Sequence, residues 1–324
     1  MTDSTAPGSP ATDPDRRTRL LAAGAVTLRG LGDVLGPLGA LFTDAGHELY
    51  LVGGSVRDAI LGRLGNDLDF TTDARPEQIL ELVGGWSDAI WDVGIEFGTV
   101  GVRKGEAMIE ITTFRADAYD RVGRNPEVTF GDTLDGDLVR RDFTINAMAV
   151  RVDADGAQDL LDPLDGVTAL LAGVIDTPAA PEDSFGDDPL RMLRAVRFIS
   201  QLGFRLAPRV ADAITRMADQ IERITAERVR MELDKLICGE YPIDAIDAMV
   251  ETGLAQHVLP EVPGMKLTID EHHQHKDVYQ HSLTVLRQAI DLEEGDPDLV
   301  LRWAALLHDI GTVSYTHLRA HETR

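Results

Sequence analysis

Cysteine is nearly absent from this 324-residue sequence, in which Cys238 carries the only thiol. A single cysteine excludes an internal disulfide framework, so a reducing cytoplasm is the expected compartment. The charged amino terminus is not followed by a secretory cleavage pattern, and no run is long and apolar enough to span a bilayer. We therefore expect no membrane partner.

Positive charge is also scarce. The chain has 31 Lys and Arg against 55 Asp and Glu, which gives a formal net charge of −24. This balance argues against a protein that coats nucleic acid through overall positive charge. The exception lies between residues 187 and 235, where ten basic residues face eight acidic ones. A polyanionic partner is expected to bind there.

The hydrophobic pattern changes along the chain and predicts several domains. Residues 1–16 are small, polar and proline-containing, which predicts a disordered arm. Short strand-like runs around a helical pattern predict an α+β head with a small mixed sheet over residues 17–175. The periodicity then becomes almost wholly helical, which predicts an all-helical neck and body over residues 176–265.

Two aspartates stand one residue apart in the stretch LYLVGGSVRDAILGRLGNDLDFTT, which begins at Leu49. In a strand, the period of two places the carboxylates of Asp67 and Asp69 on one face, and Leu68 and Phe70 on the other. Adjacent carboxylates repel each other unless a cation lies between them. Oxygen ligands of this kind suit Mg²⁺, with Mn²⁺ as the alternative.

The same stretch carries a predicted anion site. Gly53 and Gly54 allow the backbone to approach a ligand closely, and a helix that begins near Ser55 points amide donors at it. Arg57 adds a forked cation that suits phosphate oxygens. Either piece alone is more simply read as a glycine turn or as solvated aspartates. Their succession in the order strand, turn, helix, strand favours a shared pocket for a triphosphate and a metal ion.

The combination of GGSVRD and DLDF resembles the signature of the polymerase-beta-like nucleotidyltransferase superfamily. The form is that of class II tRNA nucleotidyltransferases (CCA-adding enzymes) and bacterial poly(A) polymerases. The run LVRRDFTINAMA, from Leu138 to Ala149, resembles the second head motif, and ERVRMELDKLI a later helical motif. The resemblance implies that Arg141 contacts nucleotide phosphate or ribose, with Asp142 near the sugar hydroxyls. Within that run, alternating apolar residues predict a buried strand.

Two further features of the head are interpreted in the light of this resemblance. Glu110, in IEITTFR, lies in a strand expected beside that of the aspartates and is the candidate third carboxylate. A solvent-facing glutamate is the alternative. The segment between Ala116 and Gly136 is expected to be a long loop, and in the family this region is flexible and helps to control which nucleotide is added.

The run DDPLRMLRAVRF begins at Asp187 and predicts a helix with basic residues at every third position. Asp188 and Arg191 stand three apart, and a carboxylate with a guanidinium can read the amine-plus-acceptor edge shared by cytosine and adenine. The resemblance implies this role, with Arg194 and Arg197 supporting the base and phosphates. A solvated helix face is the alternative. The family usually has Glu-Asp here, so Asp187 is a departure from its pattern.

Histidines gather near the carboxy-terminal end. His281 and the pair His308-Asp309 resemble the first ligands of an HD metal-hydrolase domain, expected in part over residues 266–312. A helical module that keeps the pattern for packing is the alternative. A complete HD site needs a further aspartate from a later helix. Residues 313–324 match no periodic element, and we expect a truncated or foreign terminus there.

The resemblance as a whole implies a template-independent enzyme. It would add CMP and AMP from CTP and ATP to the 3′ end of tRNA by two-metal phosphoryl transfer on Asp67, Asp69 and Glu110. A poly(A) polymerase or an enzyme that adds only CC or A is the nearest alternative. An HD-type metal-dependent phosphohydrolase and an inactive RNA-binding remnant are alternatives of other classes.

Overall fold

The computed structural model describes residues 14–116, 129–131, 133–267 and 278–311. The contacts divide the chain into two compact units. The first, which we call the head unit, comprises Met1–Ala172 and Asp176–Ala179, and the second, the helical unit, comprises Gly173–Ile175 and Ala180–Arg324. The predicted partial HD domain lies in the helical unit, as does the predicted neck and body from Ala180 onward, whereas Asp176–Ala179 belong to the head unit. Residues 313–324 lie outside the described residues.

A seven-stranded mixed sheet forms the centre of the head unit, with the strand order β3-β4-β5-β2-β1-β8-β9. Only β2 and β5 are parallel, and every other neighbouring pair is antiparallel. The predicted α+β head with a mixed sheet is confirmed. The strands are β1 (Leu49–Val52), β2 (Asp67–Thr72), β3 (Ala89–Trp91), β4 (Thr99–Lys104), β5 (Ala107–Thr113), β8 (Ala149–Asp153) and β9 (Gly156–Leu161).

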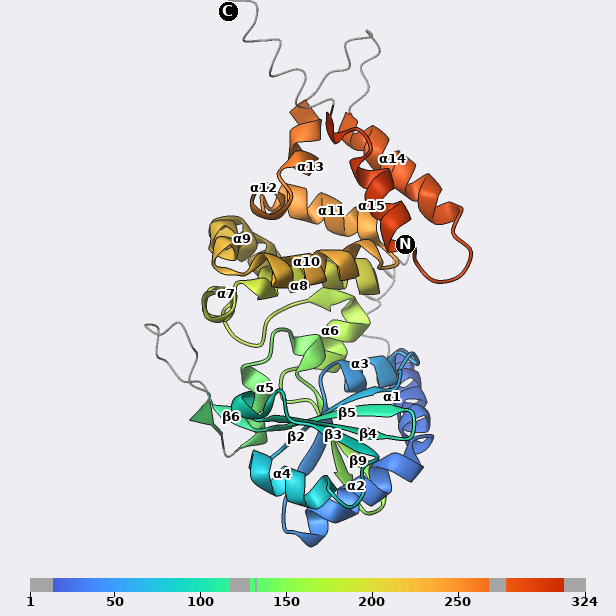
Figure 1. Ribbon diagram of the computed structural model, residues 1–324, viewed down its shortest axis with the longest axis vertical. Coiled ribbons are helices and arrows are strands. Elements are labelled where there is room, and N and C mark those ends of the chain that lie inside the picture. Colours follow the sequence, from blue (N-terminus) through green and yellow to red (C-terminus); the bar gives the residue numbers. More distant parts are fainter. Residues whose placement is uncertain (1–13, 117–128, 132, 268–277, 312–324) are drawn as a thin grey trace, which may run out of the picture. The chain divides into compact units, whose positions relative to one another are not determined.

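The two sides of the sheet differ in what covers them. Helices α2 (Gly32–Asp44) and α4 (Pro76–Val83) lie along one side, and α3 (Gly54–Ile60) and α5 (Leu134–Val139) lie along the other (Figure 1). Leu68 and Phe70 are each 1% exposed and belong to the hydrophobic core. Burying these apolar alternates leaves their neighbours on β2 to face the opposite side of the sheet.

The remaining elements of the head unit are short apart from the first helix. Helix α1 begins at Pro14, so residues 14–16 are helical and not part of a disordered arm. Residues 1–13 lie outside the described residues. The other elements are α1 (Pro14–Arg29), η2 (Ile95–Phe97), β6 (Arg115–Ala116), β7 (Thr129–Phe130), η3 (Thr144–Asn146) and α6 (Gly166–Ala172).

Two local predictions in the head unit differ from the structure, the first outright and the second only in the part of the segment that is described. The residues after Phe143 form the 3-10 helix η3 and not a strand, because the backbone N–H groups of Asn146 and Ala147 donate to carbonyl oxygens three residues earlier, on Phe143 and Thr144. Its apolar residues are nevertheless fully buried, as expected. The segment predicted as a long loop contains β7 and the start of α5; residues 117–128 and 132 lie outside the described residues.

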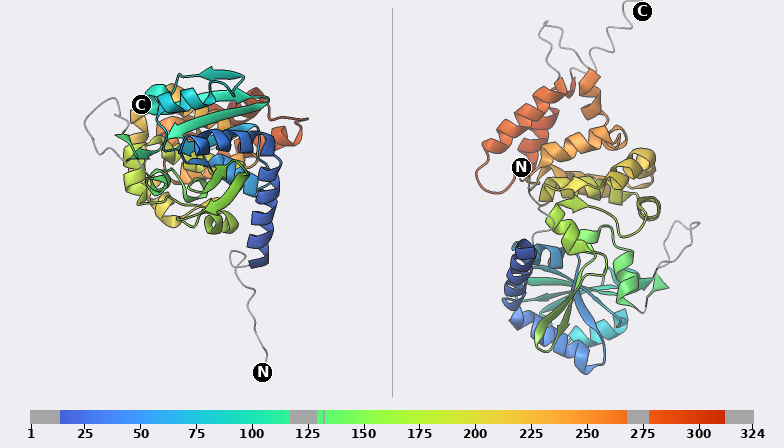
Figure 2. Two further views of the ribbon diagram at one scale, coloured as in Figure 1. Left: turned by 90° about the horizontal axis from the view of Figure 1, so that it is seen from below. Right: turned by 180° about the vertical axis from the view of Figure 1, so that it is seen from behind.

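The helical unit follows the predicted succession of helices (Figure 2). Helix α8 packs against α10 and α11. A short parallel pair, β10 (Val174–Ile175) with β11 (Arg205–Leu206), departs from the all-helical expectation. The helices are α7 (Pro181–Asp187), α8 (Leu190–Leu202), α9 (Pro208–Met217), η4 (Ala218–Arg223), α10 (Ala226–Ile237), α11 (Pro242–Glu251), α12 (Ala255–Val258), α13 (Glu261–Gly264), η5 (Met265–Leu267), α14 (Val278–Asp291) and α15 (Leu299–Leu307).

Among the described residues, no single helix has the length and apolar character needed to cross a membrane. The bent pair formed by Asp15–Arg29 and Gly32–Asp44 reaches that length and composition only when its two helices, 79° apart, are taken together.

Candidate active site

The two aspartates of β2 lie on the same face of the sheet. Asp67 and Asp69 are exposed, whereas Leu68 and Phe70 between and after them are buried. Glu110 on β5 is also exposed and stands directly opposite Asp69 in the parallel register of the two strands. The predicted row of carboxylates on one face of adjacent strands is therefore present.

The surroundings of Asp69 make its ionisation unfavourable. The Asp69 side chain reaches solvent, but the protein atoms packed around its carboxyl displace enough water to raise its pKa above the usual range, and the negative charges of Glu110 and Asp67 raise the pKa further. The positive charges of Arg141 and Arg57 act in the opposite direction. A site that concentrates negative charge in this way gains from a bound cation.

The glycine turn lies beside these carboxylates. Gly53 has φ 66° and ψ −134°, a conformation that glycine adopts far more readily than other residues. A Cβ atom added at Gly53 would lie 3.0 Å from Nη1 of Arg141 and 4.0 Å from Oδ2 of Asp69. The turn, Asp69 and the predicted phosphate-binding arginine therefore come together.

Ser55 fastens the start of α3 to β2. Its hydroxyl accepts the backbone N–H of Asp69 at 2.9 Å and donates to the backbone oxygen of Asp67 at 3.4 Å. These two bonds hold the amino terminus of α3 against the strand segment that carries both aspartates. From the sequence, Ser55 was expected only at the start of the helix, and its contact with β2 was not predicted.

Arg57 is engaged by protein groups at all three of its side-chain nitrogens. Nε and Nη2 donate to the two carboxylate oxygens of Asp58 at 3.0 and 2.7 Å, and Nη1 donates to Oδ1 of Asn146 at 2.6 Å. Asn146 in turn donates to Asp142 at 3.0 Å. Because Arg57 is only 7% exposed, its geometry suits holding α3 against η3 better than gripping a ligand directly.

Arg141 is half-buried. One terminal nitrogen of its guanidinium, Nη1, lies near the glycine turn, and the other, Nη2, is bound by a carboxylate. Nη2 donates to Oδ2 of Asp137 at 2.9 Å. Asp142, the next residue, accepts the backbone N–H of Phe143 at 2.9 Å as well as the Asn146 amide. Neither Asp137 nor Asn146 was predicted, although both lie in or next to the motif that contains the two arginines.

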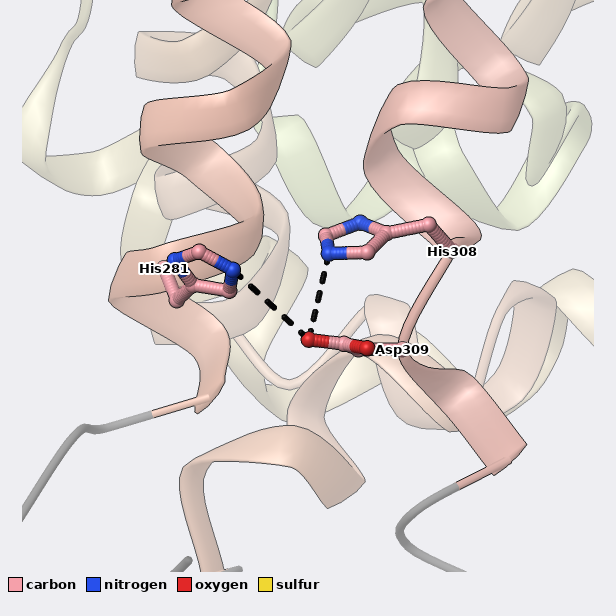
Figure 3. Close-up of side chains that lie close together, drawn as sticks. All are labelled: His281, His308 and Asp309. Carbon is pink, nitrogen blue, oxygen red and sulfur yellow. Dashed lines mark ion pairs between the residues drawn. The ribbon is translucent and has the colours of Figure 1, made fainter.

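A second cluster of ligand-type side chains lies in the helical unit (Figure 3). His281 on α14 and His308 and Asp309 after α15 have ligand atoms that all lie within 4.8 Å of one another. Within the described residues this is the only group of three or more such side chains as close as that. The predicted first ligands of an HD site are therefore brought together, whereas Asp67, Asp69 and Glu110 lie more widely spaced.

The two histidines converge on one carboxylate oxygen. Nε2 of His308 lies 3.1 Å and Nε2 of His281 lies 3.8 Å from Oδ2 of Asp309. The carbonyl oxygen of Ala305 lies 2.9 Å from Nδ1 of His308, so this nitrogen is the donor. The lone pair of Nε2 then points at Asp309 in the neutral ring, an arrangement that suits a shared cation.

The predicted base-reading residues in the helical unit have protein partners. Oδ1 of Asp188 accepts the backbone N–H of Leu190, the first residue of α8, at 3.1 Å. Oδ2 of the same residue pairs with Arg228 of α10 at 3.0 Å. Arg191 donates to the Ser184 hydroxyl at 2.8 Å. Asp188 and Arg191 thus have set orientations, but neither Arg228 nor Ser184 was predicted.

The other two predicted arginines of α8 meet a buried carboxylate. Arg197 lies 3.2 Å and Arg194 lies 3.9 Å from the carboxylate oxygens of Glu232 on α10. Arg197 and Glu232 are 7% and 5% exposed. A solvated helix face is therefore excluded for Arg197, whose contact is with the helical motif that begins at Glu227.

The sequence also matches known protein families in three places. Residues 49–176 match the poly A polymerase head domain, and residues 203–265 match the probable RNA and SrmB-binding site of polymerase A. Residues 278–323 match the HD domain, in a range that includes most of the segment predicted to be an atypical terminus. The chain belongs to the family of CCA-adding enzymes and bacterial poly(A) polymerases.

Individual members of this family are similar over much of the chain. The CCA-adding enzyme of Bacillus subtilis is 37% identical over 278 residues, which are 86% of this chain and 64% of the relative. That of Geobacillus stearothermophilus is 42% identical over 221 residues, 68% of this chain and 52% of the relative. The chain thus spans about half to two thirds of the length of these curated relatives.

Solved structures of the family have the same fold. The Bacillus stearothermophilus CCA-adding enzyme in complex with CTP matches with a TM-score of 0.66 and 34% identity, over 87% of this chain and 62% of that one. The Thermotoga maritima CCA-adding enzyme complexed with tRNA matches with a TM-score of 0.65 and 26% identity, over 85% and 62%.

Proposed function

We propose that this protein is a template-independent nucleotidyltransferase of the cytoplasm that transfers CMP and AMP from CTP and ATP to the 3′ end of tRNA. The proposal depends on one observation above all. Asp69 and Glu110 lie opposite each other on β2 and β5, on the face where Arg141 and the Gly53 turn meet them. The similarity to CCA-adding enzymes, some of them solved with CTP or with tRNA, supports the choice of substrates.

The row of carboxylates fits a hard divalent cation, because its oxygens are the ligand type that Mg²⁺ and Mn²⁺ prefer and because Asp69 is crowded by negative charge. Asp67 and Asp69 would hold the metal, with Glu110 as the third carboxylate. When bound, such ions lower the pKa of the primer 3′-hydroxyl and neutralise the departing pyrophosphate.

The remaining residues of the head unit would bind the triphosphate. The 3′-oxygen of the primer attacks the α-phosphorus in line, and the nucleotide must therefore be held still while the bond to pyrophosphate breaks. Arg141 would donate to the phosphates beside the open backbone of Gly53 and Gly54. Arg57 would act indirectly, because its nitrogens already donate to Asp58 and Asn146.

The base would be selected in the helical unit. Asp188 would accept from the exocyclic amine, and Arg191 would donate to the ring acceptor, a pattern that admits cytosine and adenine and rejects guanine and uracil. Arg228 and Ser184 would keep the two groups in this orientation. Because protein side chains would select the base, the enzyme would need no nucleic-acid template.

Incorporation of labelled CTP and ATP into tRNA that lacks CCA tests the proposal directly. Asp67→Ala should lower the rate by at least about a thousandfold, because the metal-dependent stabilisation of the transition state is lost. Asp92→Ala, which changes an exposed aspartate of the head unit, is the matched control and should keep the wild-type rate. Appreciable turnover by Asp67→Ala would contradict the assignment.

Product length separates CCA addition from its close relatives. With CTP alone a CCA-adding enzyme should stop after two nucleotides, and with both triphosphates after three. Long adenosine tails from ATP alone would identify a poly(A) polymerase instead. Addition of only CC or only A would identify a partial enzyme.

The cluster of His281, His308 and Asp309 favours a second candidate function, a metal-dependent phosphohydrolase. Hydrolysis of a phosphodiester that survives Asp67→Ala and disappears in His308→Ala would establish it. Hydrolysis that disappears in Asp67→Ala and survives in His308→Ala would assign this activity to the head unit. Binding of CTP without any incorporation would indicate an inactive RNA-binding remnant.

A further inference from the structure

Asp137 is a buried carboxylate at the centre of an arginine cluster in the head unit. It lies on α5 and its side chain is 4% exposed. Oδ2 accepts from Nη2 of Arg141 at 2.9 Å, and Oδ1 accepts the backbone N–H of Arg115 at 3.3 Å. Nε of Arg140 lies 3.6 Å from Oδ1. One carboxylate thus contacts the side chains of two arginines and the backbone of a third.

The cluster keeps a surplus of positive charge. Burial lowers the pKa of the Arg115 guanidinium, and the nearby charge of Arg140 lowers that pKa further. The single negative charge of Asp137 raises it, so Asp137 offsets part of the repulsion among the arginines. Such a cluster favours an anion next to it.

Asp137 also sets the direction in which Arg141 points. The two terminal nitrogens of a guanidinium are fixed relative to each other in one plane. With Nη2 bound to Asp137, Nη1 of Arg141 is directed to the Gly53 turn, where it lies 3.0 Å from the position of an added Cβ. The charge of Arg141 also acts on Asp69 across this turn.

We propose that Asp137 is a positioning residue for nucleotide binding, which holds the guanidinium of Arg141 toward the triphosphate without touching the nucleotide itself. The proposal rests on the proposed function, because it takes a nucleoside triphosphate as the ligand beside Gly53. Since Asp137 would act through Arg141 and the phosphates, its effect should be equal for CTP and ATP.

A purely structural role in forming α5 does not account for the side chain of Asp137. The start of that helix is already capped by Thr133, whose hydroxyl accepts the backbone N–H of Gly136 at 3.3 Å. The helix bond of Asp137 is made by its backbone N–H, which donates to the oxygen of Thr133. The carboxylate is therefore not needed to cap α5, and it accepts hydrogen bonds from Arg141 and from the backbone of Arg115.

The test is a double-mutant cycle on CTP binding in the presence of Mg²⁺, without tRNA. Asp137→Asn keeps the shape of the side chain and removes its charge, and should weaken CTP and ATP binding about tenfold each. Asp135→Asn, on the exposed side of the same helix, should bind as the wild type does. Asp137→Asn combined with Arg141→Ala should bind no more weakly than Arg141→Ala alone.

Two results would overturn the inference. The first is wild-type affinity in Asp137→Asn, and the second is an effect of Asp137→Asn that persists in full when Arg141 is already alanine. If Asp137→Asn does not fold, Asp137→Glu decides the matter. That variant keeps the charge but moves the oxygens, and it should fold and bind the nucleotides more weakly than the wild type; wild-type affinity would again overturn the inference.

The outcome is separable from that of the proposed function. If the wild type binds CTP but adds nothing to tRNA, nucleotidyl transfer fails while the cycle on Asp137 and Arg141 still gives a result. If incorporation proceeds normally and the cycle shows no coupling, the transferase assignment stands and the role of Asp137 is wrong.

Discussion

At the scale of single residues, Gly53 combines a backbone conformation that favours glycine with a close approach to the side chain of Arg141. Its positive φ is costly for other residues, and an added Cβ would meet Nη1 of Arg141 at 3.0 Å. Gly53→Ala should therefore destabilise the head unit by about 1–3 kcal/mol and also displace Arg141. We expect weaker CTP binding as well as a lower thermal midpoint, measured by titration and by thermal unfolding.

Gly62→Ala is the matched control for this prediction. Gly62 also has a positive φ, 70°, but an added Cβ would meet nothing within 4 Å. The Gly62→Ala variant should lose about as much free energy of unfolding as Gly53→Ala, and it should keep the wild-type affinity for CTP. Equal affinity in both variants would show that the close approach of Gly53 to Arg141 does not matter for binding.

Asp69 gives a prediction about pH. Burial and the charge of Glu110 raise the pKa of its carboxyl in the folded protein. A carboxyl with a higher pKa when folded holds its proton more tightly in that state, so its contribution to stability falls as the pH rises past its unfolded pKa. Asp69→Asn should therefore raise the thermal midpoint near neutral pH by a few degrees at most, because solvent screens an exposed group.

Thermal unfolding followed by circular dichroism, with a chelator present, checks this expectation. The gain should shrink as the pH falls to about 3, below the ordinary pKa of an aspartate, where the wild-type carboxyl is protonated in both states. Asp92→Asn, an exposed aspartate after β3, should show no such pH-dependent gain. A gain for Asp69→Asn that is the same at every pH would contradict the electrostatic explanation.

The position of a residue was predictable from the sequence where it follows from residue type and local spacing alone. The period of two in a strand placed Asp67 and Asp69 on one face, and this was confirmed. Residues whose role depends on a distant partner were not predictable, since a single sequence does not report tertiary contacts. Ser55 bonding to β2 and Asn146 bonding to Arg57 are examples.

At the scale of elements, the inner strands were easier to predict than the edges. Strands β1, β2, β4, β5 and β8 were expected from their apolar runs. The edge strands β3 and β9 were missed, because a strand paired on one side only buries less and shows a weaker hydrophobic pattern. The 3-10 helix η3 was mistaken for a strand because both can bury alternate residues in so short a run.

The contact between α8 and α10 gives a prediction at this scale. Arg197 and Glu232 form a buried ion pair at 3.2 Å. Glu232→Ala would leave the guanidinium buried without this partner, which typically costs about 3–5 kcal/mol. We expect a loss of that size in the free energy of unfolding of the helical unit, measured by denaturant titration.

The same helix provides the control. Glu227 is exposed at the start of α10, and Glu227→Ala should change the free energy of unfolding by less than about 0.5 kcal/mol. A similarly small effect of Glu232→Ala would show that the ion pair contributes little. Because Arg228 of this helix also pairs with Asp188, a destabilised α10 should weaken discrimination between CTP and UTP as well.

At the scale of the whole molecule, the proposed function requires that this negatively charged protein bind tRNA, which is also negatively charged. The net charge of −24 repels tRNA overall, so binding must depend on local positive charge. Such charge is concentrated between residues 187 and 235, and residues 203–265 match a family named for RNA binding. We therefore expect tRNA contacts on a limited set of arginines in the helical unit.

Salt dependence measures how many phosphates these arginines neutralise. The logarithm of the tRNA association constant should fall linearly with the logarithm of the salt concentration, and each phosphate contact contributes about 0.7–0.9 to the slope. Replacing the exposed Arg205 and Arg209 with glutamine should reduce the slope by about 1.5–2. The matched pair Arg19 and Arg29, exposed on α1 of the head unit, should leave the slope unchanged. Equal reductions from both pairs would mean that the overall charge, and not the basic segment, governs tRNA binding.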